Sequence, residues 1–356
     1  MTFFLNLLFT LLFSYLIGFK YKHTKLTDCA FYICLFYIGL VWIIIAGGQD
    51  NVGTDYPAYL DIFSGDRVEH YKKTGEIVFY YLVIFLNFLG LKGQVIFYIF
   101  YSINFIFLIF ILKRFKLRYS FLFFLLYITY CNIYNNQLNI LRQVTAIHIC
   151  TYAVILFYEN KKKLFSILIL IATGIHLSSI IFYGLFILKW INKLNKRHLK
   201  FILYFCFAAS FILSTKVFSI FTQYLPPMYA VHLLGDSLER ESMLTAITKY
   251  MYIPLFIWST FLLKNNLTPK ERSLYIIGYL GFCLRILLIK ISIISRVSDC
   301  FIILTAFPLF FLLRYLKQRN KKILFYLIVV GLIAFYGLKT LLFPSAEYMY
   351  NSIYKI

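Results

Sequence analysis

Long uninterrupted apolar runs constrain this chain more than any other feature of its sequence. Three of them read FYICLFYIGLVWIIIAG (31–47), VIFYIFYSINFIFLIFIL (95–112) and KILFYLIVVGLIAFYGL (322–338). Each is close to the roughly 20 residues that an α-helix needs to cross the hydrocarbon of a bilayer. The strands of a membrane barrel alternate apolar and polar residues in segments of about 10, whereas these runs are apolar on every face. They predict transmembrane helices.

Composition extends this prediction to the whole chain. Of its 356 residues, 62% are hydrophobic and 14% are charged, which leaves too little polar surface to cover a soluble core. We expect an all-α polytopic transmembrane bundle of about 11–13 membrane segments, forming one integral membrane domain over residues 1–356. The apolar run 2–19 has no cleavage signal after it and is interpreted as a retained first span. Residues 164–188 are expected to form two short or re-entrant helices, because small and polar residues interrupt that run near Gly174 and His176.

The distribution of charge predicts an orientation. Basic residues cluster in short connectors, which marks those connectors as cytoplasmic, so the net charge of +22 indicates topology and not nucleic acid binding. Residues 48–76 instead hold six acids against three bases, and we expect them outside. The other expected external segments are residues 131–141, residues 214–250, the region around residue 295, and the tail from residue 344. The protein is thus expected in a bacterial cytoplasmic membrane.

A polar loop, GGQDNVGTDYPAYLDIF, directly follows the first of these three runs. Gly53 permits a tight turn that points Asp55 back at the membrane surface, and Thr54 adds a hydroxyl group. The rings of Tyr56 and Tyr59 are suited to stacking on sugars. These features favour a sugar-binding loop. The alternative is an ordinary helix connection with interfacial aromatic residues.

A second polar group opens the apolar run NNQLNILRQVTAIHIC. Helical spacing places Asn139, Arg142 and Gln143 on one face. An arginine inside a span costs about 2.5–3.5 kcal/mol at the membrane centre, so Arg142 should face the bundle or a wet cavity. Its planar guanidinium suits a pyrophosphate. The alternative is an interfacial arginine paired with a carboxylate of the loop.

Further candidates lie in the later spans. Arg285 inside an apolar run and Arg296 at its outer end predict an anion-binding cavity, although Arg296 has Asp299 as a potential partner across the turn. His176 is a candidate catalyst in an apolar run, where a hydrogen-bonded core histidine is the alternative. Since no cluster of histidine, cysteine and carboxylate has ligand spacing, we expect no metal and no cofactor.

Four motifs carry a resemblance that covers most of the chain. They read VGTDYPAYLDIF (52–63), LNILRQVTA (138–146), IATGIHLSSII (171–181) and, more weakly, SRVSDCF (295–301). In this order they resemble the EpsG family of polysaccharide polymerases, which are related in function to the Wzy O-antigen polymerases. Such proteins often place an arginine just before the GTD segment, where this chain has Gly47, Gly48 and Gln49.

The resemblance implies a metal-independent membrane glycosyltransferase that joins undecaprenyl-pyrophosphate-linked oligosaccharides into O-antigen, capsule or exopolysaccharide at the external face. In that reaction Arg142 and Arg296, with Arg285, would stabilise the departing pyrophosphate. Asp55, or else His176, would orient or deprotonate the attacking hydroxyl. The expected substrate-binding residues are Gly53, Thr54, Tyr56, Tyr59, Asn139, Gln143 and Arg285.

Two other functions stay open at this point. A flippase for lipid-linked sugars would also need basic residues in a cavity, but it should show repeated halves, and none is visible. An O-antigen ligase would share the donor chemistry and use a different acceptor. The expected partners are the lipid-linked oligosaccharides and membrane lipids, with a chain-length regulator and a flippase as protein partners.

Overall fold

The computed structural model describes residues 1–20, 26–115, 119–188, 196–224, 250–263, 267–288, 292–342 and 348–354. These residues are mostly helical, so the predicted all-α bundle is confirmed. They form two compact units, Met1–Phe182 with Leu313–Ile356 and Tyr183–Leu312. Most of the external loop expected at residues 214–250 lies outside the described residues, as does the start of the tail at residue 344. The single domain expected over residues 1–356 stays a prediction.

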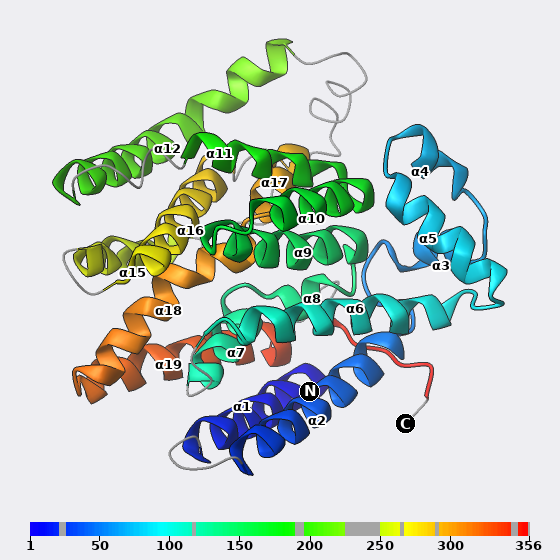
Figure 1. The fold of residues 1–356 in the computed structure, drawn as a ribbon, viewed down its shortest axis with the longest axis horizontal. Helices are drawn as coiled ribbons and strands as arrows, with labels where there is room; N and C mark the ends of the chain where they lie inside the picture. The colour runs from blue at the N-terminus through cyan, green and yellow to red at the C-terminus, as the bar shows by residue number, and fades with distance from the viewer. Residues whose placement is uncertain are drawn as a thin grey trace. The chain divides into compact units, whose positions relative to one another are not determined.

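The first unit contains the elements that carry most of the candidate residues named above. They are α1 (Thr2–Lys20), α2 (Leu26–Gly47), α3 (Tyr56–Phe63), α4 (Glu69–Lys73), α5 (Ile77–Phe88), α6 (Gln94–Leu112), α7 (Ser120–Thr129), α8 (Ile133–Asn136), α9 (Leu141–Tyr158), α10 (Lys162–Ile175), the 3₁₀ helix η2 (Leu177–Gly184), α19 (Lys322–Gly337) and the π-helical turn η5 (Leu338–Leu342). Helix α1 packs on α2 and α7, α2 on α6, and α6 on α9, while α10 packs on α9 and α5 (Figure 1).

Four helical segments in the described part of the chain are long and apolar enough to cross a membrane. They are Ala30–Gly47, Gln94–Leu112, Leu141–Tyr158 and Lys322–Leu342. The three apolar runs predicted as helices therefore form α2, α6 and α19. Helix α9 is 83% buried and lies at the centre of its unit, whereas only 33% of Lys322–Leu342 is buried. Because other apolar helices such as α5 are shorter, the count of 11–13 membrane segments stays a prediction.

The helix break expected near Gly174 and His176 is confirmed. Helix α10 ends at Ile175, His176 adopts an extended conformation with φ −151° and ψ 116°, and η2 follows directly. Gly174 allows α10 to approach α5 closely, because a β-carbon built there would lie 2.9 Å from Val78 Cβ and 3.2 Å from Val78 N. The break and the close approach together bring His176 to the start of α5.

The C-terminal tail returns to the loop that follows α2. Asp50 N donates to Asn351 O at 3.0 Å, and Ile353 N donates to Gly48 O at 3.0 Å. Tyr350 Oη adds a 2.9 Å hydrogen bond to Ile45 O. These contacts hold the tail on the same side of the first unit as the loop of residues 48–76.

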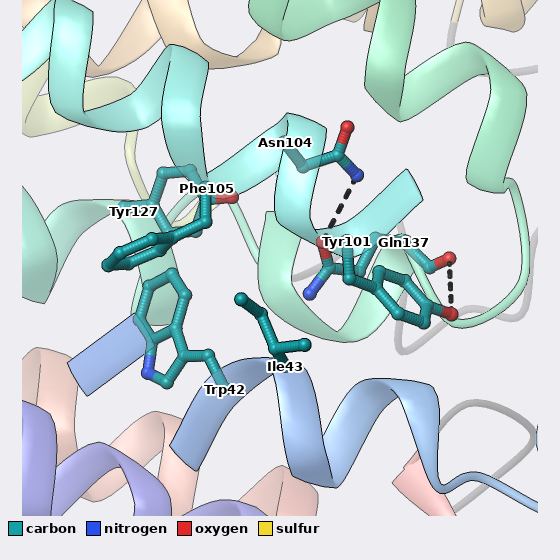
Figure 2. A pocket seen from close by; sticks show the side chains of 7 residues that line it. All are labelled: Trp42, Ile43, Tyr101, Asn104, Phe105, Tyr127 and Gln137. Carbon is teal, nitrogen blue, oxygen red and sulfur yellow. Dashed lines mark hydrogen bonds between the residues drawn. The ribbon is translucent and has the colours of Figure 1, made fainter. Parts of the chain in front are cut away.

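The core of the first unit holds a small polar cavity between α2, α6 and α7. Figure 2 shows Trp42, Asn104 and Gln137 around it, with the Asn104 amide donating to Gln137 Oε1 at 3.4 Å. Its volume of about 10 Å³ is at the lower limit for one water molecule. Asn104 Oδ1 is buried there without a hydrogen-bond partner among the described residues, so a water would suit this position.

The second unit is a smaller helical cluster. Its elements are α11 (Leu185–Leu188), α12 (Lys196–Tyr224), α15 (Ile253–Ser259), the 3₁₀ helix η4 (Thr260–Leu263), α16 (Pro269–Leu287), α17 (Ser292–Asp299) and the first part of α18 (Ile302–Gln318). Helix α16 begins with a capping box, in which Thr268 and Glu271 exchange side-chain and backbone hydrogen bonds, and it packs on α12 and α17.

Candidate functional site

A buried carboxylate, Glu76, gathers charged and polar groups from three separate parts of the first unit. Its side chain is 9% exposed. Arg142 Nη1 forms an ion pair with Oε2, His176 Nδ1 lies 3.0 Å from Oε1, and Leu177 N donates to Oε1 at 3.4 Å. Both carboxylate oxygens are therefore engaged. The start of α5, the start of α9 and the end of α10 meet at this point.

Aromatic rings cover the guanidinium of Arg142. Its Cζ lies 4.3 Å from the ring centre of Tyr71 and 5.2 Å from that of Phe79, distances at which a cation is attracted to the ring face. Arg142 N donates to Tyr59 Oη at 3.3 Å. Arg142 thus faces the interior of the bundle, as expected. Its partner, however, is Glu76, a carboxylate of the loop, and pairing with a loop carboxylate was the alternative to pyrophosphate binding.

Asn139 holds the loop of residues 53–55 against the start of α9. Its Oδ1 accepts from Asp55 N at 2.9 Å and from Thr54 Oγ1 at 3.2 Å. Gly53 has φ +78°, and a β-carbon there would lie 2.8 Å from Asn139 Oδ1. The turn therefore needs glycine for both its backbone conformation and its space. The sequence placed these residues in one candidate site, and they are in contact.

The two tyrosines of the loop are packed inside the protein. Tyr56 is 4% exposed and stacks on Phe97, and Tyr59 is 5% exposed and stacks on Phe63. Neither ring offers an open face to a sugar in this structure, because both are part of an aromatic core between α3 and α6. Tyr56 Oη also donates to Gln94 Oε1 at 2.7 Å. These residues fix the loop.

Gln49 is the last residue of the short segment, Gly47 to Gln49, in which the resemblance leads one to expect an arginine. It is fully buried, and its Nε2 donates to Tyr101 Oη at 2.7 Å. The backbone carbonyl oxygen of Gln49 accepts from Gln94 Nε2 at 2.9 Å. A neutral amide in this place supports the base of the loop and adds no positive charge to the site.

Electrostatics keep Glu76 ionised. Burial opposes ionisation, but the hydrogen bond from His176 and the positive charge of Arg142 outweigh it, so the pKa of Glu76 is lowered from its ordinary value. Burial raises the pKa of Tyr59 and of Tyr71, although Arg142 opposes the increase. The cluster therefore contains one carboxylate, one guanidinium, one imidazole and neutral phenols.

The remaining candidates lie elsewhere. In the second unit, Arg285 Nε lies 3.6 Å from Asp299 Oδ1. Asp299 is the residue that the sequence suggests as a partner of Arg296, and in the structure it contacts Arg285. Arg296 is exposed on α17. Its expected meeting with Asp55 and Arg142 would span the two units and stays a prediction. In the first unit, Gln143 is buried within α9.

Sequence reasoning missed Glu76 and Tyr71 as members of the site. Both were counted only as part of an acidic external loop. The sequence did contain one indication of the role of Glu76, because this residue directly precedes the apolar helix α5. An acidic residue at the start of one apolar helix is a natural partner for an arginine at the start of another apolar helix. No three histidine, cysteine or acidic side chains among the described residues are placed to hold a metal ion, and metal independence stays a prediction.

Comparison with known protein families gives the same family that the motifs meeting at Glu76 resemble. A model described as the EpsG family matches residues 31–355, nearly the whole chain. No curated protein and no solved structure matches the sequence. The matched range contains the loop, the start of α9 and the helix break at His176. The chain therefore belongs to the EpsG family, as a multi-pass membrane protein with a polysaccharide-polymerase type of role.

Proposed function

We propose that this protein joins undecaprenyl-pyrophosphate-linked oligosaccharide repeat units into a surface polysaccharide at the outer face of the bacterial cytoplasmic membrane. One observation carries the proposal. Three motifs separated by many residues in the sequence, around Gly53, Arg142 and His176, come together in one partly buried polar cluster. Such a concentration of charge inside an apolar bundle is costly and is typical of a functional site.

The chemistry proposed for the site is glycosyl transfer. An acceptor hydroxyl needs a base, and the departing pyrophosphate needs positive charge. Asp55 and His176 are the two candidate bases. We propose Arg296, with Arg285, as the cations for the pyrophosphate itself, since the guanidinium of Arg142 is held by Glu76. O-antigen, capsule and exopolysaccharide are equally compatible products.

Surface polysaccharide in a deletion strain tests this function. We expect surface lipid capped with single repeat units and no ladder of longer chains. Complementation with the unchanged gene should restore the ladder. For an O-antigen product, complete loss of surface sugar would contradict the polymerase and favour the flippase or the ligase.

A substitution at Arg142 tests whether this site performs the reaction. Arg142→Ala should abolish long chains while the protein stays in the membrane fraction. Because that change leaves Glu76 buried without its ion-pair partner, the double variant Glu76→Gln/Arg142→Met provides a second test without an unpaired charge. Arg67→Ala is the matched control, since Arg67 lies in the same loop with a side chain that is 74% exposed. A normal ladder from both site variants would rule out this location.

A further inference from the structure

The contacts of Glu76 determine which nitrogen of His176 carries a proton. An ionised carboxylate only accepts hydrogen bonds, and His176 Nδ1 lies 3.0 Å from Glu76 Oε1, so the hydrogen belongs on Nδ1. In a neutral imidazole the other nitrogen, Nε2, then has a free lone pair. His176 Nε2 is buried and has no hydrogen-bond partner among the described residues. It is an acceptor that still lacks its donor.

We propose that Glu76 is a positioning residue that holds His176 with Nδ1 protonated, so that Nε2 accepts the proton of the acceptor sugar hydroxyl. This inference rests on the polymerase function proposed above and identifies its base. It selects His176 over Asp55, whose carboxylate lies on the loop beside the Thr54 hydroxyl at 3.3 Å. The backbone at His176 supports the assignment, because the helix ends there and turns the ring toward Glu76.

The proton and electron balance of the step is simple. The acceptor oxygen forms a bond to the anomeric carbon of the donor sugar while the bond from that carbon to the pyrophosphate oxygen breaks. The electron pair of the broken bond leaves with undecaprenyl pyrophosphate. The hydroxyl proton moves to His176 Nε2, and the resulting imidazolium is stabilised by the carboxylate of Glu76.

The same contacts give Arg142 a different role from the one expected from the sequence. Its guanidinium is paired with Glu76 Oε2 and covered by the ring of Tyr71. In this position it keeps the carboxylate ionised and oriented. A pyrophosphate at the same guanidinium would compete with Glu76, so Arg142 acts on the base and leaves the leaving group to other cations.

Kinetics in lipid nanodiscs test the proposal, with purified lipid-linked repeat units as substrate. Glu76→Gln preserves side-chain volume and removes the charge that orients His176. We expect kcat to fall on the order of 10²- to 10⁴-fold, with KM changed less than about threefold. His176→Gln should show a similar loss, and the double variant should lose no more than the worse single variant, because the two residues act as a unit. Glu69→Gln, which changes an acid of the same loop bonded to Tyr80, is the control and should retain full activity.

A second measurement uses the unchanged protein and does not depend on folding of a variant. Nitrogen-15 NMR of histidine-labelled protein identifies the His176 signal by its loss in His176→Gln. In the neutral ring we expect the hydrogen on Nδ1, which faces Glu76. A neutral ring with its hydrogen on Nε2 and none on Nδ1 would overturn the proposal, as would wild-type kcat in Glu76→Gln or additive losses in the double variant. If unchanged protein makes no polymer in the nanodisc assay, the polymerase function itself fails, and the role of Glu76 in it fails too.

Discussion

Glu76 is ionised in a place where burial alone would favour the neutral acid. Its carboxylate depends on Arg142 and His176, and each of them depends on the carboxylate. Removal of one member leaves a buried charge or a buried polar atom without a partner, which is more costly than removal of the pair. The residues of this site are therefore coupled, and single substitutions should be compared with paired ones.

The lowered pKa of Glu76 predicts a pH dependence of stability. When a carboxyl group has a lower pKa in the folded state than in the unfolded state, its ionised form stabilises the fold above the unfolded value, near 4.5, and this contribution is lost as pH falls through the lower folded value. Thermal unfolding in detergent should show a fall in melting temperature below pH 4.5 that is smaller in Glu76→Gln. An identical acid response in both proteins would contradict the assignment.

The turn at Gly53 allows two effects of a side chain to be separated. Gly53→Ala should cost about 1–3 kcal/mol locally through backbone strain, and it should also displace Asn139. Gly90→Ala is the matched control, because Gly90 has the same φ of +78° and no atom within 4 Å of the added β-carbon. We expect faster hydrogen exchange at Asp55 N and shorter polymer with Gly53→Ala alone. Equal effects of the two changes would show that contact with Asn139 is unimportant.

Among the elements, α10 positions the site through its packing on α5. Gly174→Ala should force the two helices apart, since the new methyl group meets the side chain of Val78, and this movement should separate His176 from Glu76. Polymer should decrease, and Val78→Ala should restore part of the activity in the double variant. Gly331→Ala in α19 meets no atom within 4 Å and should leave activity unchanged. A failure of Val78→Ala to improve Gly174→Ala would argue against this packing explanation.

Elements of this protein differ in how well sequence predicts them. Apolar run length was sufficient for α2, α6 and α19, because a bilayer requires a helix whatever its neighbours are. The break at His176 was also predictable, since small and polar residues interrupt the run. The ion pair between Glu76 and Arg142 was not, because the two residues are 66 positions apart and only the packing of α5, α9 and α10 brings them together. The burial of Tyr56 and Tyr59 was missed for the same reason.

At the scale of the whole molecule, the central position of α9 explains why the ring nitrogens of His148 are both satisfied by protein. His148 is fully buried there, with Nδ1 2.8 Å from Val144 O and Nε2 2.8 Å from Tyr127 Oη. His176, by contrast, has one engaged nitrogen and one without a partner among the described residues. Comparison of the two histidines separates a core residue from a candidate catalytic one, a distinction that the sequence alone did not settle.

The docked C-terminal tail offers a direct way to determine which side of the membrane carries the site. Because Ile353 and Asn351 are hydrogen-bonded to Gly48 and Asp50, the tail and the loop that begins at Gly48 share one compartment. An alkaline phosphatase fused behind the tail is active only outside the cytoplasm, and a fluorescent protein fused there folds well only inside it. One pair of fusions therefore reports the compartment of the loop without any change to its residues.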